Sequence, residues 1–211
     1  DQIRQKLLDR LDQPVTEIHI VNGLHSGLSF DYYTDCLRVL KELRPDVHLK
    51  AYTAVEIHYF AEKYGMSHEQ VLRELIDAGL GSLPGGGAEI FAERVRHKIC
   101  KGKADAAQWL EVHRTAHRLG LRSNCTMLYG TIETLEERVD HMLRLRDLQA
   151  ETGGFQTFIP LAFHHEGNDF ARLPEPTGVD NLRTYAVARL MLPNIPHIKA
   201  YWIMIGVKIA Q

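Results

Sequence analysis

Runs of apolar and β-branched residues alternate with helix-forming segments along the whole chain of 211 residues. The apolar runs begin near residues 16, 47, 80, 121, 155 and 198, so successive runs start roughly 31 to 43 residues apart. Strands that alternate with helices at this spacing are typical of βα units, which build a parallel sheet. Six units without a break in composition predict an α/β fold in one domain, 1–211, that forms part of a (β/α)8 barrel. An open doubly wound sheet is the alternative, although no Gly-x-Gly-x-x-Gly motif opens the first helix as in a Rossmann unit.

Local patterns predict the individual elements. We expect strands over 16–22, 47–53, 80–83, 121–129, 155–163 and 198–205, and helices over 1–11, 31–44, 55–63, 67–78, 88–100, 104–119, 134–152 and 181–192. Asp31 is a candidate N-cap, and Ser67 with Gln70 has capping-box spacing. Gly120 and Gly153 are expected at helix C-termini, where glycine readily adopts a positive φ.

Composition excludes several classes of protein. A formal net charge of -2 without a long basic run disfavours nucleic-acid binding. No segment approaches the ~18 consecutive apolar residues of a membrane helix, and the start does not resemble a signal peptide. Cys36, Cys100 and Cys125 are spaced too widely for a metal-ligand or redox pair, so we expect three small buried side chains. This sparse usage is typical of the reducing cytoplasm, and we expect neither a nucleic acid nor a membrane as partner.

A glycine-rich stretch lies between the third predicted strand and the next helix. Residues 82–91 read Ser-Leu-Pro-Gly-Gly-Gly-Ala-Glu-Ile-Phe. Glycine allows the backbone to approach a ligand closely and exposes N–H groups to it. A simple turn between strand and helix also uses glycine, but three in succession exceed what such a turn needs. We therefore interpret the stretch as a candidate ligand-binding loop.

Polar residues interrupt the strands with a period of two. Such a period places one set of them on a single face of the sheet: His48, Lys50, Tyr52, Asn124, Thr126, Lys199 and Tyr201. The opposite face, with Val47, Leu49 and Ala51 in the second strand, suits packing under helices. An unpaired buried polar group costs on the order of 1–3 kcal/mol, so the polar faces are expected to line a barrel that holds a large polar ligand. Pairing among themselves or with water is the alternative.

The carboxyl ends of the predicted strands are also polar. They carry Asn22 to His25, Thr53 to Glu56, the glycine-rich stretch with Glu89, Tyr129 to Glu133, and His164 to Glu166. Active sites of βα barrels lie at this edge. Five polar strand ends in one ring therefore predict a functional site there.

Histidines offer a second interpretation of the same edge. His25, His164 and His165 could together bind zinc or iron, as in a metal-dependent barrel hydrolase. Other histidines fall on predicted helices, where we expect them to be solvated or half-buried: His58, His68, His97, His113, His117 and His141.

Several segments resemble radical S-adenosylmethionine (SAM) enzymes, in the branch shared by menaquinone biosynthesis through futalosine and deazaflavin cofactor biosynthesis. They are Asn22-Gly-Leu-His25, His48-Leu-Lys-Ala-Tyr-Thr-Ala-Val-Glu56, residues 82–91 and Arg122-Ser-Asn-Cys-Thr-Met-Leu-Tyr-Gly130. Within this branch, Trp109-Leu-Glu-Val-His-Arg-Thr-Ala-His117, Phe158-Ile-Pro-Leu-Ala-Phe-His164 and His197-Ile-Lys-Ala-Tyr-Trp202 are most similar to the aminofutalosine synthase family. The similarity covers essentially the whole chain in order. The sister families, dehypoxanthine futalosine cyclase and deazaflavin cofactor synthase, remain the alternatives.

The resemblance implies a partial radical SAM barrel that works with a 4Fe-4S cluster and SAM. In this family a 5′-deoxyadenosyl radical adds to the enolpyruvyl double bond of 3-[(1-carboxyvinyl)oxy]benzoate, and rearrangement with loss of bicarbonate gives aminofutalosine. An electron donor such as flavodoxin or ferredoxin is implied as a partner. The radical chemistry belongs to cluster and SAM, whereas the protein positions them and excludes water.

The resemblance also implies which residues bind the cofactor. Asn22 and Gly23 lie where the family binds the methionyl amino group. Glu56 and Ser82 are expected near the ribose or methionine part. The remaining cofactor positions are backbone N–H groups at Gly85, Gly86 and Gly87 for a carboxylate, Glu89 beside them, Asn124 and Thr126 in the SAM pocket, and Gly130 to Glu133 at the adenine side.

For the two carboxylates of the substrate, the candidate partners are Lys50, His164 and Lys199. No residue of the chain is assigned a catalytic role.

The family's cluster motif, Cys-x-x-x-Cys-x-x-Cys, lies after its first strand, and the three cysteines of this chain cannot replace it. The chain begins inside a helical pattern without an initiator Met. We therefore expect an internal fragment, inactive alone, that lacks an N-terminal cluster-binding unit and a C-terminal βα unit. The chain itself supplies no metal ligand in this interpretation.

Overall fold

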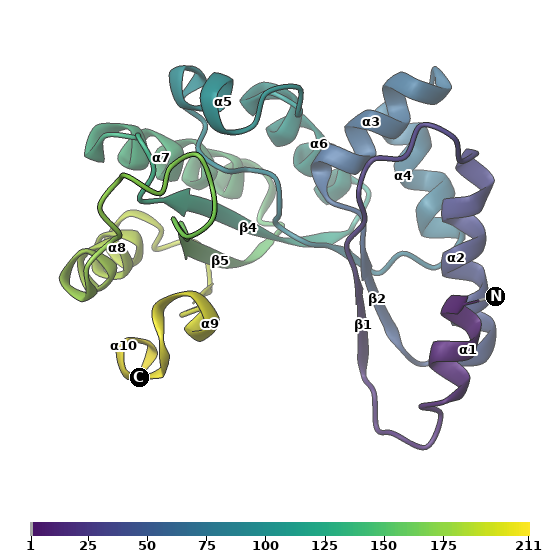
Figure 1. Cartoon of the computed structure of the whole chain (residues 1–211). Coiled ribbons are helices and arrows are strands. Elements are labelled where there is room, and N and C mark those ends of the chain that lie inside the picture. Colours follow the sequence, from purple (N-terminus) through teal and green to yellow (C-terminus); the bar gives the residue numbers. More distant parts are fainter. Residues whose placement is uncertain (1) are drawn as a thin grey trace.

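The computed structural model describes residues 2–211 and contains, within them, one parallel sheet of six strands in sequential order. The strands are β1 (Glu17–Ile20), β2 (His48–Ala51), β3 (Ser82–Leu83), β4 (Arg122–Tyr129), β5 (Phe155–Ala162) and β6 (His197–Ile198). The sheet is curved, with α2 to α4 outside β1 and β2 and with α6 and α7 outside β4 (Figure 1). This arrangement confirms a partial α/β barrel, because sequential parallel strands with helices on one side are its building units.

The helices follow the predicted alternation. They are α1 (Gln2–Leu8), α2 (Phe30–Leu43), α3 (Ala54–Tyr64), α4 (His68–Asp77), α5 (Glu93–Ile99), α6 (Ala106–Arg118), α7 (Leu135–Thr152), α8 (Gly178–Met191), α9 (Trp202–Ile205) and α10 (Val207–Ala210). The capping box of Ser67 and Gln70 is confirmed. Asp31 was wrongly predicted as an N-cap, because Ser29 holds that position and Asp31 lies in the first turn. No helix within residues 2–211 is long and apolar enough to cross a membrane.

The apolar faces of the strands pack against the helices as expected. Leu49 and Ala51 are fully buried, and burial raises the pKa of the thiols of Cys36, Cys100 and Cys125. Cys100 and Cys125 are buried, whereas Cys36 is only half-buried. The cysteines therefore act mainly as small packing side chains.

Two predicted elements differ most in extent from those of the structure. The strand expected over 198–205 ends at Ile198, and the following apolar residues instead form α9, whose Ile205 is buried. The helix expected over 88–100 begins only at Glu93. Before it, Glu89 has a φ of 47°, and its carbonyl oxygen accepts a hydrogen bond from Leu128 N at 2.8 Å. Contacts with β4 therefore replace helical hydrogen bonds there.

Tyr52 also departs from the expected barrel-facing side. Its φ is 57°, and its hydroxyl donates to the carbonyl oxygen of Tyr33 at 2.7 Å. Its ring packs against Tyr33 and Phe60 in the core beneath the helices. The positive φ at the end of β2 breaks the period of two, because it turns the side chain to the other face.

Three helical histidines that were expected to be solvated or half-buried are instead buried: His113, His117 and His141. Thr152 Oγ1 donates to Leu148 O at 2.9 Å, so it accepts from Nδ1 of His117 at 2.7 Å. Nε2 of His117 is then unprotonated and accepts from Ser123 Oγ at 2.8 Å. The neutral ring is thereby fixed in one tautomer.

His141 is likewise held as a neutral ring. Its Nδ1 accepts from Phe91 N at 3.2 Å, and its Nε2 donates to Thr126 O at 2.9 Å. It joins α7 to β4 and to the segment before α5, and its ring stacks on Phe91.

These histidines predict loss of stability in acid. Burial lowers the pKa of His117 to about 4 and that of His141 to about 3, whereas an unfolded histidine titrates near 6.5. Below about pH 6.5 the unfolded chain binds more protons, so the free energy of unfolding falls by up to ~1.4 kcal/mol per pH unit and histidine. In full-length protein, urea midpoints between pH 7 and 5 should fall less steeply for His141→Gln than for wild type. Exposed His97→Gln is the control, and equal slopes in all three proteins would contradict the account.

The segment after β3 crosses very close to β4. A Cβ on Gly85 would lie 2.8 Å from backbone atoms of Asn124 and Cys125, which cannot move aside easily. A Cβ on Gly86 would meet only the methyl group of Thr53, at 3.2 Å. Thr126 Oγ1 also donates to Gly85 O at 2.6 Å, which fixes the crossing.

Gly85→Ala should therefore destabilise the protein by about 1–3 kcal/mol, as overpacking does in a well-packed core. Gly86→Ala, one residue away, should cost less. Thermal midpoints of the two full-length variants compare them directly. A Gly85→Ala midpoint at or above that of Gly86→Ala would show that β4 does not restrict this position.

Candidate functional site

The loops that follow the strands meet at one edge of the sheet, because parallel strands end on the same side. The edge is built from the segment after β1, the start of α3, the glycine-rich segment after β3, the loop between β4 and α7, and the residues after β5. All five polar strand ends expected from the sequence thus belong to this edge.

Glu56 joins the ends of β1 and β2. Its side chain is buried, with 2% of the residue exposed, and accepts hydrogen bonds from Thr53 N and Oγ1 at 2.8 Å each. It also accepts from Asn22 N at 3.3 Å. Burial raises the pKa of Glu56, although the hydrogen bonds from Thr53 and Asn22 oppose this effect. Asn22 and Gly23 themselves are exposed.

Ser82 and Gly86 differ in their burial and in their hydrogen bonds to the rest of the protein. Ser82 is buried, and its Oγ lies 2.7 Å from Nε2 of His48. Gly86 is half-buried, and its carbonyl oxygen accepts from Trp109 Nε1 at 3.2 Å. Within residues 2–211 the N–H groups of Gly86 and Gly87 make no hydrogen bond to protein. These two N–H groups are therefore available to an anionic group.

Glu89 forms an ion pair with a residue of the loop that precedes α6. Its carboxylate lies 2.9 Å from Nζ of Lys103, and its backbone is bonded to β4. Lys103 therefore already neutralises the charge of Glu89 in this structure.

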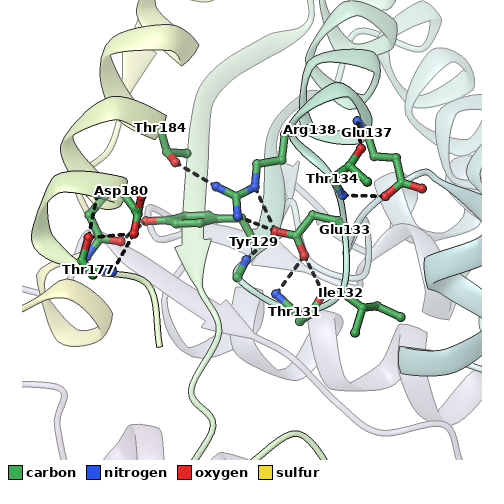
Figure 2. A network of polar contacts seen from close by, with 12 residues as sticks. Tyr129, Thr131, Ile132, Glu133, Thr134, Glu137, Arg138, Thr177, Asp180 and Thr184 are labelled. Atoms are coloured by element: carbon green, nitrogen blue, oxygen red, sulfur yellow. Dashed lines mark hydrogen bonds and ion pairs between the residues drawn. The ribbon is translucent and has the colours of Figure 1, made fainter. Parts of the chain in front are cut away.

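The loop after β4 is organised by Glu133 (Figure 2). The fully buried carboxylate accepts from Gly130 N at 2.5 Å and from Thr131 N at 2.8 Å. Arg138 of α7 pairs with it at 2.7 Å and bonds to Thr184 Oγ1 of α8 at 3.3 Å. One carboxylate thus fixes the turn and ties it to two helices.

The aromatic ring of Tyr129 lies beneath the guanidinium group of Arg138, whose central carbon is 5.0 Å from the ring centroid. Its hydroxyl donates to Asn181 Oδ1 at 2.8 Å, and burial raises its pKa. The sequence motif included Tyr129 and Glu133 but missed Arg138. No spacing rule links Glu133 to an arginine five residues later, since helical neighbours lie three or four apart.

The barrel-facing side carries several charged groups. Lys50 Nζ lies 2.7 Å from Glu17, and His19 is paired with Lys50 in the register of β1 and β2. Burial is the main cause that lowers the pKa of His19, and Lys50 and Lys199 lower it further while Glu17 opposes them. Lys50 on β2 and Lys199, which follows β6, therefore both influence His19. Asn124 and Thr126 both lie on β4, where Asn124 is half-buried and Thr126 is buried.

The three candidate metal-binding histidines lie in different surroundings. His25 and His164 are exposed, and Nδ1 of His25 accepts from Gly27 N at 3.0 Å. His165 is 3% exposed, and its Nε2 lies 2.8 Å from Gly130 O. Within residues 2–211 no three His, Cys, Asp or Glu side chains form a group that could hold a metal ion. The geometry therefore does not support the hydrolase alternative.

The lack of such a group within residues 2–211 also shows which of the two expected cofactors, the 4Fe-4S cluster and SAM, fits the described residues. The described cysteines lie apart on α2, at the end of α5 and on β4, so residues 2–211 do not supply the ligands of a 4Fe-4S cluster. SAM fits better. The edge offers two unengaged backbone N–H groups, at Gly86 and Gly87, and a buried ring nitrogen without a partner, Nδ1 of His165.

Comparisons with known proteins place the chain among its relatives. A model of the radical SAM superfamily matches residues 1–145, and a model of the CofH/MqnC C-terminal region matches residues 152–211. Aminodeoxyfutalosine synthase of Thermus thermophilus is 54% identical over 100% of the chain, and that of Streptomyces coelicolor is 52% identical over 93%. The chain spans 58% and 54% of these two relatives.

A more distant relative has a different name. The 5-amino-6-(D-ribitylamino)uracil–L-tyrosine 4-hydroxyphenyl transferase of Methanopyrus kandleri is 40% identical over 100% of the chain and 58% of its own length. The solved structure of Elp3 from Methanocaldococcus infernus superposes with a TM-score of 0.62 at 12% identity, over 94% of this chain and 51% of that one. This similarity concerns the fold alone.

Enzymes of the matched superfamily use a 4Fe-4S cluster and SAM, the two cofactors expected from the sequence. The superfamily model covers more than half of the chain, and the parallel strands with outer helices agree with it. The chain belongs to the radical SAM superfamily.

Proposed function

We propose that the protein containing this chain is a radical SAM transferase that adds the 5′-deoxyadenosyl radical to 3-[(1-carboxyvinyl)oxy]benzoate and forms aminofutalosine for menaquinone biosynthesis. The observation that carries the proposal is 54% identity, over the whole chain, to a relative named aminodeoxyfutalosine synthase. The relative named as a 4-hydroxyphenyl transferase reaches 40% over the same length. The protein works in the cytoplasm and receives electrons from a donor such as flavodoxin or ferredoxin.

In this proposal the strand-end edge binds SAM. When bound, the cluster and SAM supply the radical chemistry, and the chain positions the reactants and excludes water. The N–H groups of Gly86 and Gly87 bind the carboxylate of SAM, while Asn22 and Gly23 lie near its amino group. The proposal keeps the other cofactor-side residues predicted from the sequence: Glu56, Ser82, Gly85, Glu89, Asn124, Thr126, Gly130 and Glu133.

The barrel-facing cations bind the substrate. Its two carboxylates require positive partners, and the charges of Lys50 and Lys199 both contribute, after burial, to lowering the pKa of His19. Lys50 is already paired with Glu17 at 2.7 Å, so a substrate carboxylate must compete with Glu17 for it. Lys199 is exposed and forms no ion pair within residues 2–211, which makes it the more available partner. His164, exposed at the end of β5, completes the proposed set.

The second candidate is a sister activity, transfer of a 4-hydroxyphenyl group from L-tyrosine to 5-amino-6-(D-ribitylamino)uracil. Its support is the 40% identity that extends over the whole chain.

The full-length protein, reconstituted without oxygen and supplied with reductant and SAM, separates the two candidates. Mass spectrometry should detect aminofutalosine when 3-[(1-carboxyvinyl)oxy]benzoate is added and no coupled product when L-tyrosine and 5-amino-6-(D-ribitylamino)uracil are added. Omission of reductant is the control for radical chemistry. A coupled product from the tyrosine pair alone would overturn the proposal.

Lys199→Met tests the substrate side. Loss of one hydrogen bond to a charged group costs about 1.5–3 kcal/mol, so the KM for the enolpyruvyl benzoate should rise about 10- to 100-fold. SAM affinity should stay within twofold of wild type. Lys208→Met on α10 is the matched control, because Lys208 is likewise an exposed lysine. If the two variants have the same KM, Lys199 does not bind substrate.

A further inference from the structure

Three buried side-chain atoms lack a hydrogen-bond partner within residues 2–211: Tyr33 Oη, His113 Nε2 and His165 Nδ1. The first two lie in the core beneath the helices, where Tyr33 packs on Phe60 and His113 on Trp109. His165 alone among the three follows a strand at the ligand-binding edge, directly after β5. A buried polar atom without a partner costs about 1–3 kcal/mol, so its presence at this edge requires an explanation.

The hydrogen bond on the other side of the ring defines what Nδ1 can do. Nε2 of His165 lies 2.8 Å from the carbonyl oxygen of Gly130, which can only accept, so Nε2 carries a proton. A neutral imidazole has one proton, and burying an unpaired charged ring would cost more. Nδ1 is therefore an acceptor, and its missing partner must be an N–H or O–H donor.

The position of the ring is well defined. Gly130 is held by Glu133 and faces Pro176, and the edge of the His165 ring meets Phe163, whose centroid is 5.1 Å away. Phe163 in turn contacts Phe170 of the connection between β5 and α8. The ring is thus fixed between the loop after β4 and this connection, as a residue that orients a ligand group must be.

We propose that Nδ1 of His165 accepts a hydrogen bond from a donor group of SAM, so that His165 is a cofactor-binding residue. The choice between cofactor and substrate rests on the proposed function. At neutral pH, 3-[(1-carboxyvinyl)oxy]benzoate carries two carboxylates and an ether oxygen, which are all acceptors. SAM carries an α-ammonium group, two ribose hydroxyls and an adenine amino group, which are donors. Of the two ligands, only SAM can donate a hydrogen bond to the unpaired nitrogen.

Nδ1 is covered by protein in this structure, so SAM must displace protein atoms to reach it. The neighbouring connection, residues 166–177, has no helix or strand and is largely exposed, and is the part that can move. The unpaired nitrogen raises the free energy of the ligand-free protein, and the new hydrogen bond recovers this cost on binding.

Two substitutions separate the two ring nitrogens. The side-chain amide of His165→Gln reaches the position of Nε2 and can still donate to Gly130 O, but nothing replaces Nδ1. The amide oxygen of His165→Asn lies near the position of Nδ1 and can still accept. Isothermal titration of full-length protein with S-adenosylhomocysteine, which is unreactive and has the same donors, measures affinity without turnover.

We expect His165→Gln to bind S-adenosylhomocysteine about tenfold more weakly than wild type, the loss expected for one hydrogen bond and an unpaired donor. His165→Asn should retain more of the affinity than His165→Gln, even if its thermal midpoint is lower. His97→Gln on α5, an exposed histidine, is the control and should bind as wild type. Titration with 5′-deoxyadenosine and with L-methionine then identifies whether the donor belongs to the nucleoside or to the ammonium group.

Wild-type affinity in His165→Gln would overturn the proposal. An equal loss in both variants, following their loss of thermal stability, would also overturn it and leave His165 a purely structural role. The binding of S-adenosylhomocysteine involves no substrate. The titration therefore tests the role of His165 separately from the proposed transferase reaction.

Discussion

Two buried carboxylates hold the carboxyl-end edge of the sheet together, and the rest of the candidate site depends on them. Glu56 accepts hydrogen bonds from the backbone at the ends of β1 and β2, and Glu133 does the same for the turn after β4. Both groups follow their strand closely in sequence, so each carboxylate binds a loop that would otherwise leave N–H groups unpaired. A buried carboxylate is tolerated because several donors, and for Glu133 also Arg138, compensate for its lost hydration.

This arrangement changes how the edge can bind a ligand. The oxygens of Glu56 and Glu133 are engaged by protein, and Glu89 is paired with Lys103. The groups left for a ligand are of a different kind: the N–H groups of Gly86 and Gly87, the ring nitrogen of His165, and Lys199 on the barrel-facing side. They include donors, an acceptor and a cation, which together suit a zwitterionic cofactor beside an anionic substrate.

The order of strands and helices could be predicted from the sequence because the alternation of βα units is strong and repeats along the chain. The capping box of Ser67 with Gln70 was recognisable because both residues act through local backbone geometry. Predictions based on a period of two or on composition failed where tertiary contacts decide. Tyr52 turns inward through a positive φ, and residues 202–205 pack as a helix although they are apolar enough for a strand.

The polar contacts of the site could be predicted only in part. Strand-end residues such as Asn22 and Gly86 followed from topology, since parallel strands end together. Arg138 and the buried ring of His141 could not, because their partners lie on other elements and nothing in the spacing indicates them. The proposed division of residues between SAM and substrate rests on hydrogen-bond complementarity, and judging that complementarity requires placed side chains.

The central claim is that the carboxyl-end edge of the sheet binds SAM. Hydrogen–deuterium exchange of the full-length protein, with and without S-adenosylhomocysteine, tests it most directly. The account predicts slower exchange on binding at residues 22–23, 84–87 and 130–133, with unchanged exchange at the opposite ends of the strands, around residues 45–48 and 120–122. Protection confined to those opposite ends, or none at the glycine-rich segment at saturating ligand, would contradict it.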